Sequence, residues 1–105
     1  MGKYVFVVYT QPFEGQDAEY NKWYDEIHVA DVEKLDGVLS ARRYRLADMD
    51  QPSKGQPPYL ALYELELDDV SVFPGQIAKA IEEGRMPLSP AMDRSKTVRA
   101  YYEVI

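Results

Sequence analysis

The sequence contains a single histidine, His28, which lies between two aspartates in the run NKWYDEIHVADV (residues 21–32). An imidazole has an ordinary pKa of about 6.5, so His28 is the side chain best suited to move a proton near neutral pH. A structural role is the alternative: a histidine at a helix end can donate to a backbone carbonyl and interact favourably with the helix dipole. Residue type and spacing leave both roles open.

The same run offers a metal-ligand spacing, because Asp25, His28 and Asp31 stand at positions i, i+3 and i+6. On a regular helix, however, Asp25 and Asp31 are about 120° apart, so the three side chains do not converge easily. The chain has one histidine and no cysteine. We therefore expect no metal site.

Tyrosine is unusually frequent, with nine in the chain beside three phenylalanines and one tryptophan. Tyr24 precedes His28 by about one helical turn, and Tyr63 and Tyr101 lie within expected strands. Their hydroxyl groups could stabilise an enolate or a phenolate. The alternative for each is packing in the core or at an interface, where a tyrosine combines a large apolar ring with a polar tip.

Two neighbouring arginines, Arg42 and Arg43, must point to opposite faces of an expected strand. Only one of them is easily solvated. We expect the other to pair with a carboxylate such as Glu64 or Glu103, or to meet an anionic group of a ligand.

Several other chemistries lack their characteristic residues. No G-x-S-x-G, phosphate-binding P-loop or G-x-G-x-x-G motif occurs. The absence of cysteine excludes a catalytic thiol. A haem ligand would have to be His28 or a tyrosine, and no haem-attachment motif is present. We therefore expect no cofactor.

Length and charge narrow the class of protein further. A chain of 105 residues predicts one domain spanning residues 1–105. The net charge of −6 disfavours partners such as nucleic acid or an anionic membrane surface, since both require a basic face. The apolar run 4–9 is too short to span a bilayer, and no signal segment opens the chain. We expect a cytoplasmic protein.

The expected elements alternate in type. Apolar and aromatic runs predict strands over 3–10, 38–46, 59–67 and 95–105. A helix is expected from residue 18, capped by Asp17, with Tyr20, Trp23, Tyr24 and Ile27 on one apolar stripe. A second helix is expected over 76–84, after a turn at Pro74-Gly75, and loops over 47–58 and 85–94.

The first helix contains an inconsistency. If it continued regularly, Asp31 would fall near the middle of the apolar stripe, where an unpaired carboxylate is costly. Either the helix breaks near residues 28–30 or Asp31 has a specific partner. The break is the prediction, with Asp31 opening a short second turn.

The order β-α-β-β-α-β predicts the ferredoxin-like α+β sandwich with an antiparallel sheet of strand order 4-1-3-2. The two most apolar strands then lie in the centre, and the arginine-bearing strands lie at the edges. Two helices cover only one sheet face, yet the first strand is apolar on both. A second copy presenting the same face would bury the other, so we expect a homodimer.

Three runs carry a resemblance to a known family: N-x-W-Y-D-E-I-H-V-A-D-V (21–32), D-G-V-L-S-A-R-R-Y-R-L (36–46) and G-R-M-P-L-S-P-A-M-D (84–93). Together they resemble EthD-like members of the dimeric α+β barrel superfamily. Members commonly have proline two residues after the histidine, where this chain has Ala30. The resemblance implies a homodimeric barrel with a pocket between sheet and helices. The superfamily includes lactone isomerases, cyclases, monooxygenases and haem-degrading enzymes, so fold alone does not select a reaction.

The resulting hypothesis is a pocket for a hydrophobic or aromatic small molecule, with His28 transferring protons in an isomerase, cyclase or lyase. The residues expected to bind substrate are Tyr24, Asp31, Arg43, Tyr63 and Tyr101. Two alternatives stay open: a non-catalytic binding protein that uses the same pocket, and a structural dimer without a ligand.

Overall fold

A computed structural model describes residues 1–49 and 55–105. Its strands are β1 (Gly2–Thr10), β2 (Val38–Arg45), β3 (Tyr59–Leu67) and β4 (Val98–Glu103). Its helices are α1 (Asp17–Trp23), the π-helical turn η1 (Tyr24–His28), α2 (Val29–Glu33) and α3 (Phe73–Glu82). Two short 3₁₀ turns complete the order, η2 (Val70–Val72) and η3 (Arg94–Lys96).

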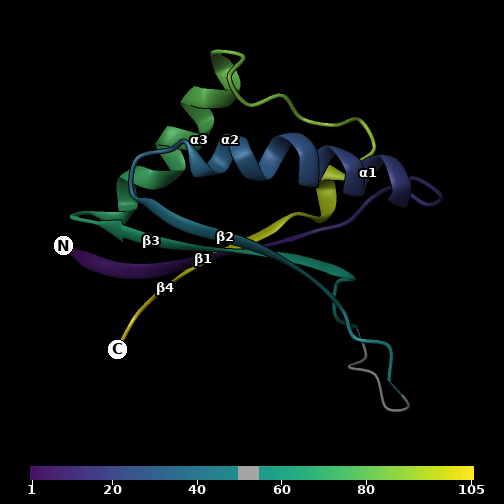
Figure 1. The fold of residues 1–105 in the computed structure, drawn as a ribbon, viewed down its shortest axis with the longest axis horizontal. Helices are drawn as coiled ribbons and strands as arrows, with labels where there is room; N and C mark the ends of the chain where they lie inside the picture. Colours follow the sequence, from purple (N-terminus) through teal and green to yellow (C-terminus); the bar gives the residue numbers. More distant parts are fainter. Residues whose placement is uncertain (50–54) are drawn as a thin grey trace.

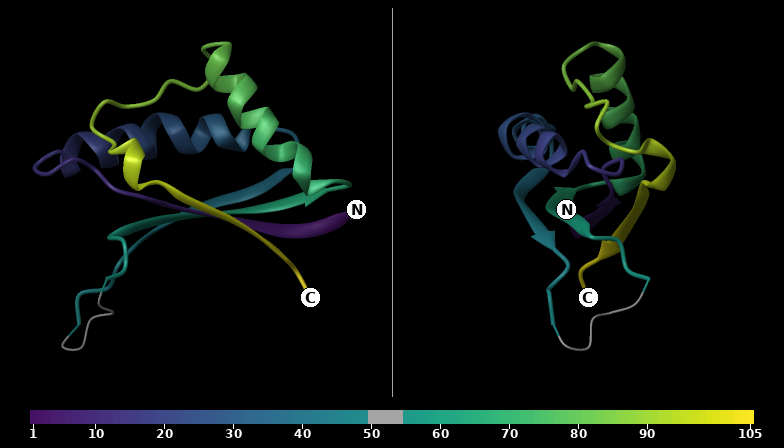
Figure 2. Two further views of the ribbon diagram at one scale, coloured as in Figure 1. Left: turned by 180° about the vertical axis from the view of Figure 1, so that it is seen from behind. Right: turned by 90° about the vertical axis from the view of Figure 1, so that its right-hand side faces the viewer.

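The four strands form one antiparallel sheet in the order β2-β3-β1-β4, which confirms the predicted topology. The helical layer lies on one face of this sheet, with α1 to α2 running along it and α3 crossing beside it (Figures 1 and 2). Each element therefore buries its apolar side against a single shared core.

Strand register decides which side chains face the helices. Phe6 pairs with Tyr63 on one side and with Tyr101 on the other. Because side chains alternate along strands, these three residues share the helix-facing side with Val8 and Arg99. Phe6 stacks on the Tyr101 ring at a centroid distance of 4.5 Å. The aromatic residues that were prominent in the sequence therefore form much of the core under the helices.

The predicted break in the first helix is wrong. The helix continues from α1 into α2 through the wide turn η1, in which the Val29 N–H donates to the Tyr24 carbonyl five residues earlier. This wider turn changes which residues face inward: Ile27, predicted on the apolar stripe, is 42% exposed, while Val32 is buried. A continuous helix with a wide turn thus replaces the broken helix.

The second helix begins earlier than predicted, at Phe73, because Pro74 occupies its first turn, where a missing N–H costs nothing. The chain that follows α3 then crosses over α1 (Figure 1). Backbone bonds tie it to the segment after β1: the Phe13 N–H donates to Ala91 O, and the Asp93 N–H to Gln11 O, each at 2.8 Å. This loop is therefore held in place over the helical layer.

The opposite face of the sheet has no helix over it (Figure 2). Register places Val7, Leu62 and Ala100 side by side on this face. The predicted loop 47–58 lies partly outside the described residues, which end at 49 and resume at 55. No helix in the described part of the chain is long and apolar enough to cross a membrane.

Candidate functional site

A cavity of about 150 Å³ lies between the helix-facing side of the sheet and the helical layer. Strands β1, β3 and β4 supply its floor, the first helix supplies one wall, and α3 with the following loop supplies the other. The lining residues are Phe6, Val8, Thr10, Tyr24, His28, Val32, Tyr63, Ile77, Ile81, Met86, Leu88, Met92, Arg94, Thr97 and Arg99. The site is thus a mainly apolar chamber with a few polar groups.

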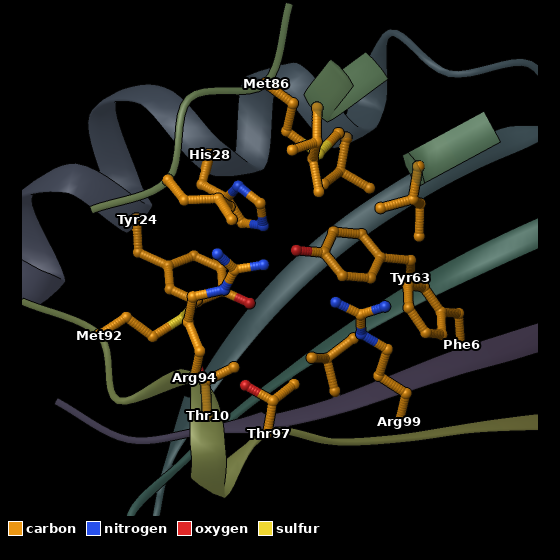
Figure 3. A pocket seen from close by; sticks show the side chains of 15 residues that line it. Phe6, Thr10, Tyr24, His28, Tyr63, Met86, Met92, Arg94, Thr97 and Arg99 are labelled. Atoms are coloured by element: carbon orange, nitrogen blue, oxygen red, sulfur yellow. The ribbon is translucent and has the colours of Figure 1, made fainter. Parts of the chain in front are cut away.

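His28 enters this cavity because of the wide turn η1. On a regular helix Trp23 and His28 would point about 140° apart, whereas here their rings stack at a centroid distance of 4.6 Å. Tyr24 meets the His28 ring edge-on at 5.0 Å. The imidazole is therefore held between two aromatic rings and directed into the cavity (Figure 3).

Burial lowers the pKa of His28 to about 4, and the positive charges of Arg99 and then Arg43 lower it in the same direction. The ring is accordingly neutral at pH 7. Its Nδ1 atom is buried and has no hydrogen-bond partner within residues 1–49 and 55–105. A neutral imidazole in this position has one unprotonated ring nitrogen, which can accept a proton.

Tyr63 reaches the same space from β3, and its hydroxyl points toward the His28 ring (Figure 3). The residue is only 1% exposed, and its hydroxyl has no hydrogen-bond partner among the described residues. The Tyr24 hydroxyl lies close enough to affect the pKa of Tyr63, but no hydrogen bond of good geometry joins the two. Burial raises the pKa of Tyr63, so the group stays protonated and can donate.

Arg43 lies outside the cavity lining. Its guanidinium group donates to Asp25 Oδ1 at 2.7 Å and to Asn21 Oδ1 at 2.8 Å, and it lies 4.3 Å from the centre of the Tyr24 ring. The ion pair expected with Glu64 or Glu103 is therefore made with Asp25. Arg43 therefore has a carboxylate, an amide oxygen and an aromatic ring as protein partners.

Two further predicted residues also lie outside the cavity lining. Asp31 has one carboxylate oxygen 4.0 Å from Lys34 Nζ, and its other oxygen is buried without a partner in the described part of the chain. The Tyr101 ring packs on Phe6, and its buried hydroxyl has no partner there either. Of the residues expected to bind substrate, only Tyr24 and Tyr63 line the cavity with His28.

Arg94 and Arg99 line the cavity and were not among the predicted site residues. Alternation in the last strand indicates that Arg99 shares a face with Tyr101, but it does not say which face the helices cover. That choice depends on pairing between β1 and β4. Arg94 lies in a segment predicted as a loop, and no sequence signal places it at the cavity.

Among the described residues, no group of three or more His, Cys, Asp or Glu side chains is arranged to hold a metal ion. The polar groups of the cavity lining are one neutral imidazole, two protonated phenols, two threonine hydroxyls and two guanidinium groups. This set can accept a proton from carbon and donate hydrogen bonds to an oxygen that gains negative charge.

Solved structures define the fold, whereas no protein-family model and no curated protein sequence matches the chain. The haem-degrader MhuD from Mycobacterium tuberculosis, solved with two haems in its active site, has a TM-score of 0.67 at 21% identity, over 97% of this chain and 95% of that one. A Dabb family protein with a ferredoxin-like fold from Mesorhizobium loti has a TM-score of 0.63 at 14% identity, over 100% of this chain and 99% of that one.

An EthD family protein from Bacillus halodurans has a TM-score of 0.57 at 15% identity, over 100% of both chains. The chain therefore has the ferredoxin-like α+β fold of the EthD-like and Dabb proteins, and the resemblance stated from the sequence is confirmed at the level of the fold. At these identities the likeness carries the fold alone, so the reaction must be argued from the cavity.

Proposed function

We propose that this protein is a homodimer in which each cavity binds a single-ring hydrophobic or aromatic molecule, and that His28 moves a proton on that molecule. The reaction class is that of a cofactor-independent isomerase, cyclase or lyase. The observation that carries this proposal is the pairing of a neutral imidazole with a tyrosine hydroxyl that has no partner among the described residues, both directed at one cavity.

The chemistry follows from the protonation states. His28 accepts a proton from a carbon beside a carbonyl group, and the electron pair moves onto the carbonyl oxygen. Tyr63 donates a hydrogen bond to that oxygen, which stabilises the resulting enolate in a site of low dielectric. Return of the proton from His28 to another carbon gives an isomer, whereas loss of a leaving group or ring closure gives the lyase or cyclase outcome.

The cavity volume limits the ligand. A cavity of about 150 Å³ is the size that accommodates one benzene ring. MhuD holds two haems in its active site, but a likeness at 21% identity carries no ligand over to this chain. We therefore assign no haem chemistry to this chain and favour ligands such as lactones, cyclic ketones and substituted phenols.

Deuterium exchange tests the proton transfer without knowledge of the natural substrate. Butenolides and cyclic ketones are incubated in D₂O, and incorporation at the carbon beside the carbonyl is followed by proton NMR. The wild type should accelerate exchange, and His28→Gln should reduce that acceleration by about 10²- to 10⁴-fold while the probe still binds. Tyr63→Phe should reduce it as well.

The same experiment separates the alternatives. Binding of probes with no exchange in the wild type would leave a non-catalytic binding protein. A wild type that binds none of the ring-sized probes would leave a structural dimer. An unchanged exchange rate in His28→Gln would remove the histidine from the mechanism.

The homodimer is proposed from the uncovered face of the sheet. Apolar residues predominate at its centre, with Glu64 as the charged neighbour of Val5: Val5, Val7, Tyr9, Leu60, Leu62, Val98, Ala100 and Tyr102. Tyr102 is 60% exposed in the protomer. Contact with the same face of a second copy would bury about 800 Å² per subunit, the size of a standard interface.

Sedimentation at micromolar concentration tests this assembly. The wild type should sediment as a dimer, and Tyr102→Glu should yield the protomer, because it buries a charge in the proposed interface. Val72→Glu is the matched control, since Val72 is 53% exposed and lies outside the sheet, directly before α3. A wild type that sediments only as a 12.1 kDa species would contradict the dimer.

A further inference from the structure

The cavity is lined by two arginine side chains and by no carboxylate. Arg99 comes from β4, and Arg94 comes from η3 just before it. Among residues 1–49 and 55–105, the three ion pairs are Lys34–Asp31, Arg43–Asp25 and Arg85–Glu83, so neither cavity arginine takes part in one. Two exposed arginines that form no ion pair within the described residues therefore border a mainly apolar space.

This arrangement contrasts with the charge of the whole chain. Carboxylates outnumber basic side chains, with 18 Asp and Glu against 12 Lys and Arg. Carboxylates that could pair with an arginine are thus abundant, and Arg43 and Arg85 do form ion pairs. A local positive field at a cavity in an acidic protein attracts and orients an anionic ligand, because low-dielectric walls concentrate that field.

We infer that Arg99, with Arg94 beside it, binds a carboxylate of the ligand, so that the substrate class is a small single-ring acid. This inference rests on the proposed function and narrows it. A guanidinium group presents two parallel N–H donors that match a carboxylate. In Figure 3 the guanidinium group of Arg99 borders the same space as His28 and Tyr63, so a ring held by its acid group would lie between them.

Carboxylate binding would also change the strength of the base. The charged and titratable groups around His28 are Arg99 from β4, Arg43 from β2, Tyr63 from β3, Arg94 from η3 and Tyr24 from its own helix. After burial, Arg99 is the largest cause that lowers the pKa of His28. An anion paired with Arg99 offsets that charge and raises the pKa of His28, which makes it a better base for the bound acid.

A matched pair of ligands tests the inference: benzoate and benzamide have nearly the same shape and differ in charge. Calorimetry should show the wild type binding benzoate about tenfold or more tightly than benzamide. Arg99→Gln should lose that preference with benzamide affinity unchanged, and Arg99→Lys should keep part of it. Arg85→Gln is the control, because Arg85 lies outside the cavity and pairs with Glu83.

An NMR titration of the His28 ring protons gives an independent measurement. Benzoate should raise the pKa of His28 in the wild type and should leave it nearly unchanged in Arg99→Gln. Equal binding of benzoate and benzamide by the wild type would overturn the carboxylate site and leave the proton-transfer proposal standing. If neither benzoate nor benzamide binds, the carboxylate site and the proton-transfer proposal are both overturned. A preference for benzoate without deuterium exchange would support the carboxylate site alone.

Discussion

Arg43 and Arg99 approach the helical layer from opposite edges of the sheet, on β2 and β4. The Arg43 side chain is 15% exposed and donates to Asp25 and Asn21. Arg99 is exposed, borders the cavity and takes part in none of the ion pairs of the described residues. The two arginines thus differ in role: the guanidinium group of Arg43 stabilises the fold through its protein partners, whereas that of Arg99 is available to a ligand.

The contrast extends to the neighbouring polar groups. Around Arg43, carboxylate, amide and aromatic ring form a closed set of contacts. Around the cavity, His28 Nδ1 and the Tyr63 hydroxyl are buried without partners in the described part of the chain. Buried polar groups without partners reduce stability, and the two at the cavity, unlike those of Asp31 and Tyr101, border a space in which a ligand could pair with them.

The largest expected effect concerns acid stability at the cavity. His28 has an ordinary pKa of 6.5 when unfolded and about 4 when folded, so between these values the unfolded chain binds more protons. The free energy of unfolding should therefore fall by at most about 3 kcal/mol as the pH drops from about 6.5 to about 4. Urea titrations across this range measure it.

His28→Gln is the comparison for that titration. The hydroxyl and the backbone N–H of Ser71 lower the pKa of Asp69, which adds acid destabilisation to both proteins. Only the difference between the two pH profiles isolates the histidine. Parallel profiles from pH 4 to 6.5 would show that His28 is not held neutral by the fold.

Arg43→Met should produce the next largest effect, a loss of about 2 kcal/mol in the free energy of unfolding. The substitution removes two charge-assisted hydrogen bonds and leaves the Asn21 and Asp25 oxygens unpaired. Urea denaturation at pH 7 is the measurement. A change within 0.5 kcal/mol, combined with lost benzoate binding, would return Arg43 to the substrate-binding set.

Tyr63→Phe should stabilise the protein by about 1 kcal/mol, because it removes a buried hydroxyl that has no partner. Thermal melting gives the direction, and the deuterium exchange assay on the same variant should show reduced exchange. A gain in stability with a loss of exchange would mark a residue kept for function. Destabilisation would mean that the hydroxyl makes a structural hydrogen bond.

The smallest expected effect is that of Arg99→Gln on stability, within about 0.5 kcal/mol, as for an exposed residue without a partner. Urea denaturation of Arg99→Gln and Arg43→Met in parallel compares their free energies of unfolding directly. A loss as large as that of Arg43→Met would show that Arg99 also serves the fold.

Local sequence pattern predicts most of the fold. Strand β3 has the predicted bounds, because the run YLALYELEL is apolar and aromatic between a proline-rich segment and two aspartates. The order of elements fixes the sheet topology through general rules of connection. The aromatic stripe of the first helix also indicates which residues surround His28, and Tyr24 does line the cavity beside it.

The candidate site is only partly predictable, because its geometry depends on residues that are far apart in the sequence. The turn η1, the pairing of Arg43 with Asp25 and the entry of Arg99 into the cavity depend on contacts between distant parts of the chain. The Trp23 indole N–H, for example, donates to the Pro87 carbonyl at 3.1 Å, which ties the first helix to the loop over the cavity. The periodic pattern of residues along one helix does not predict a contact of this kind.

By itself, then, the sequence determined the type and the order of the elements, since these follow from residues a few positions apart. Only the tertiary structure decided that Arg43 pairs with a carboxylate whereas Arg99 does not, and which buried polar atoms have no hydrogen-bond partner among the described residues. Both depend on register across the sheet and on packing of the first helix against it.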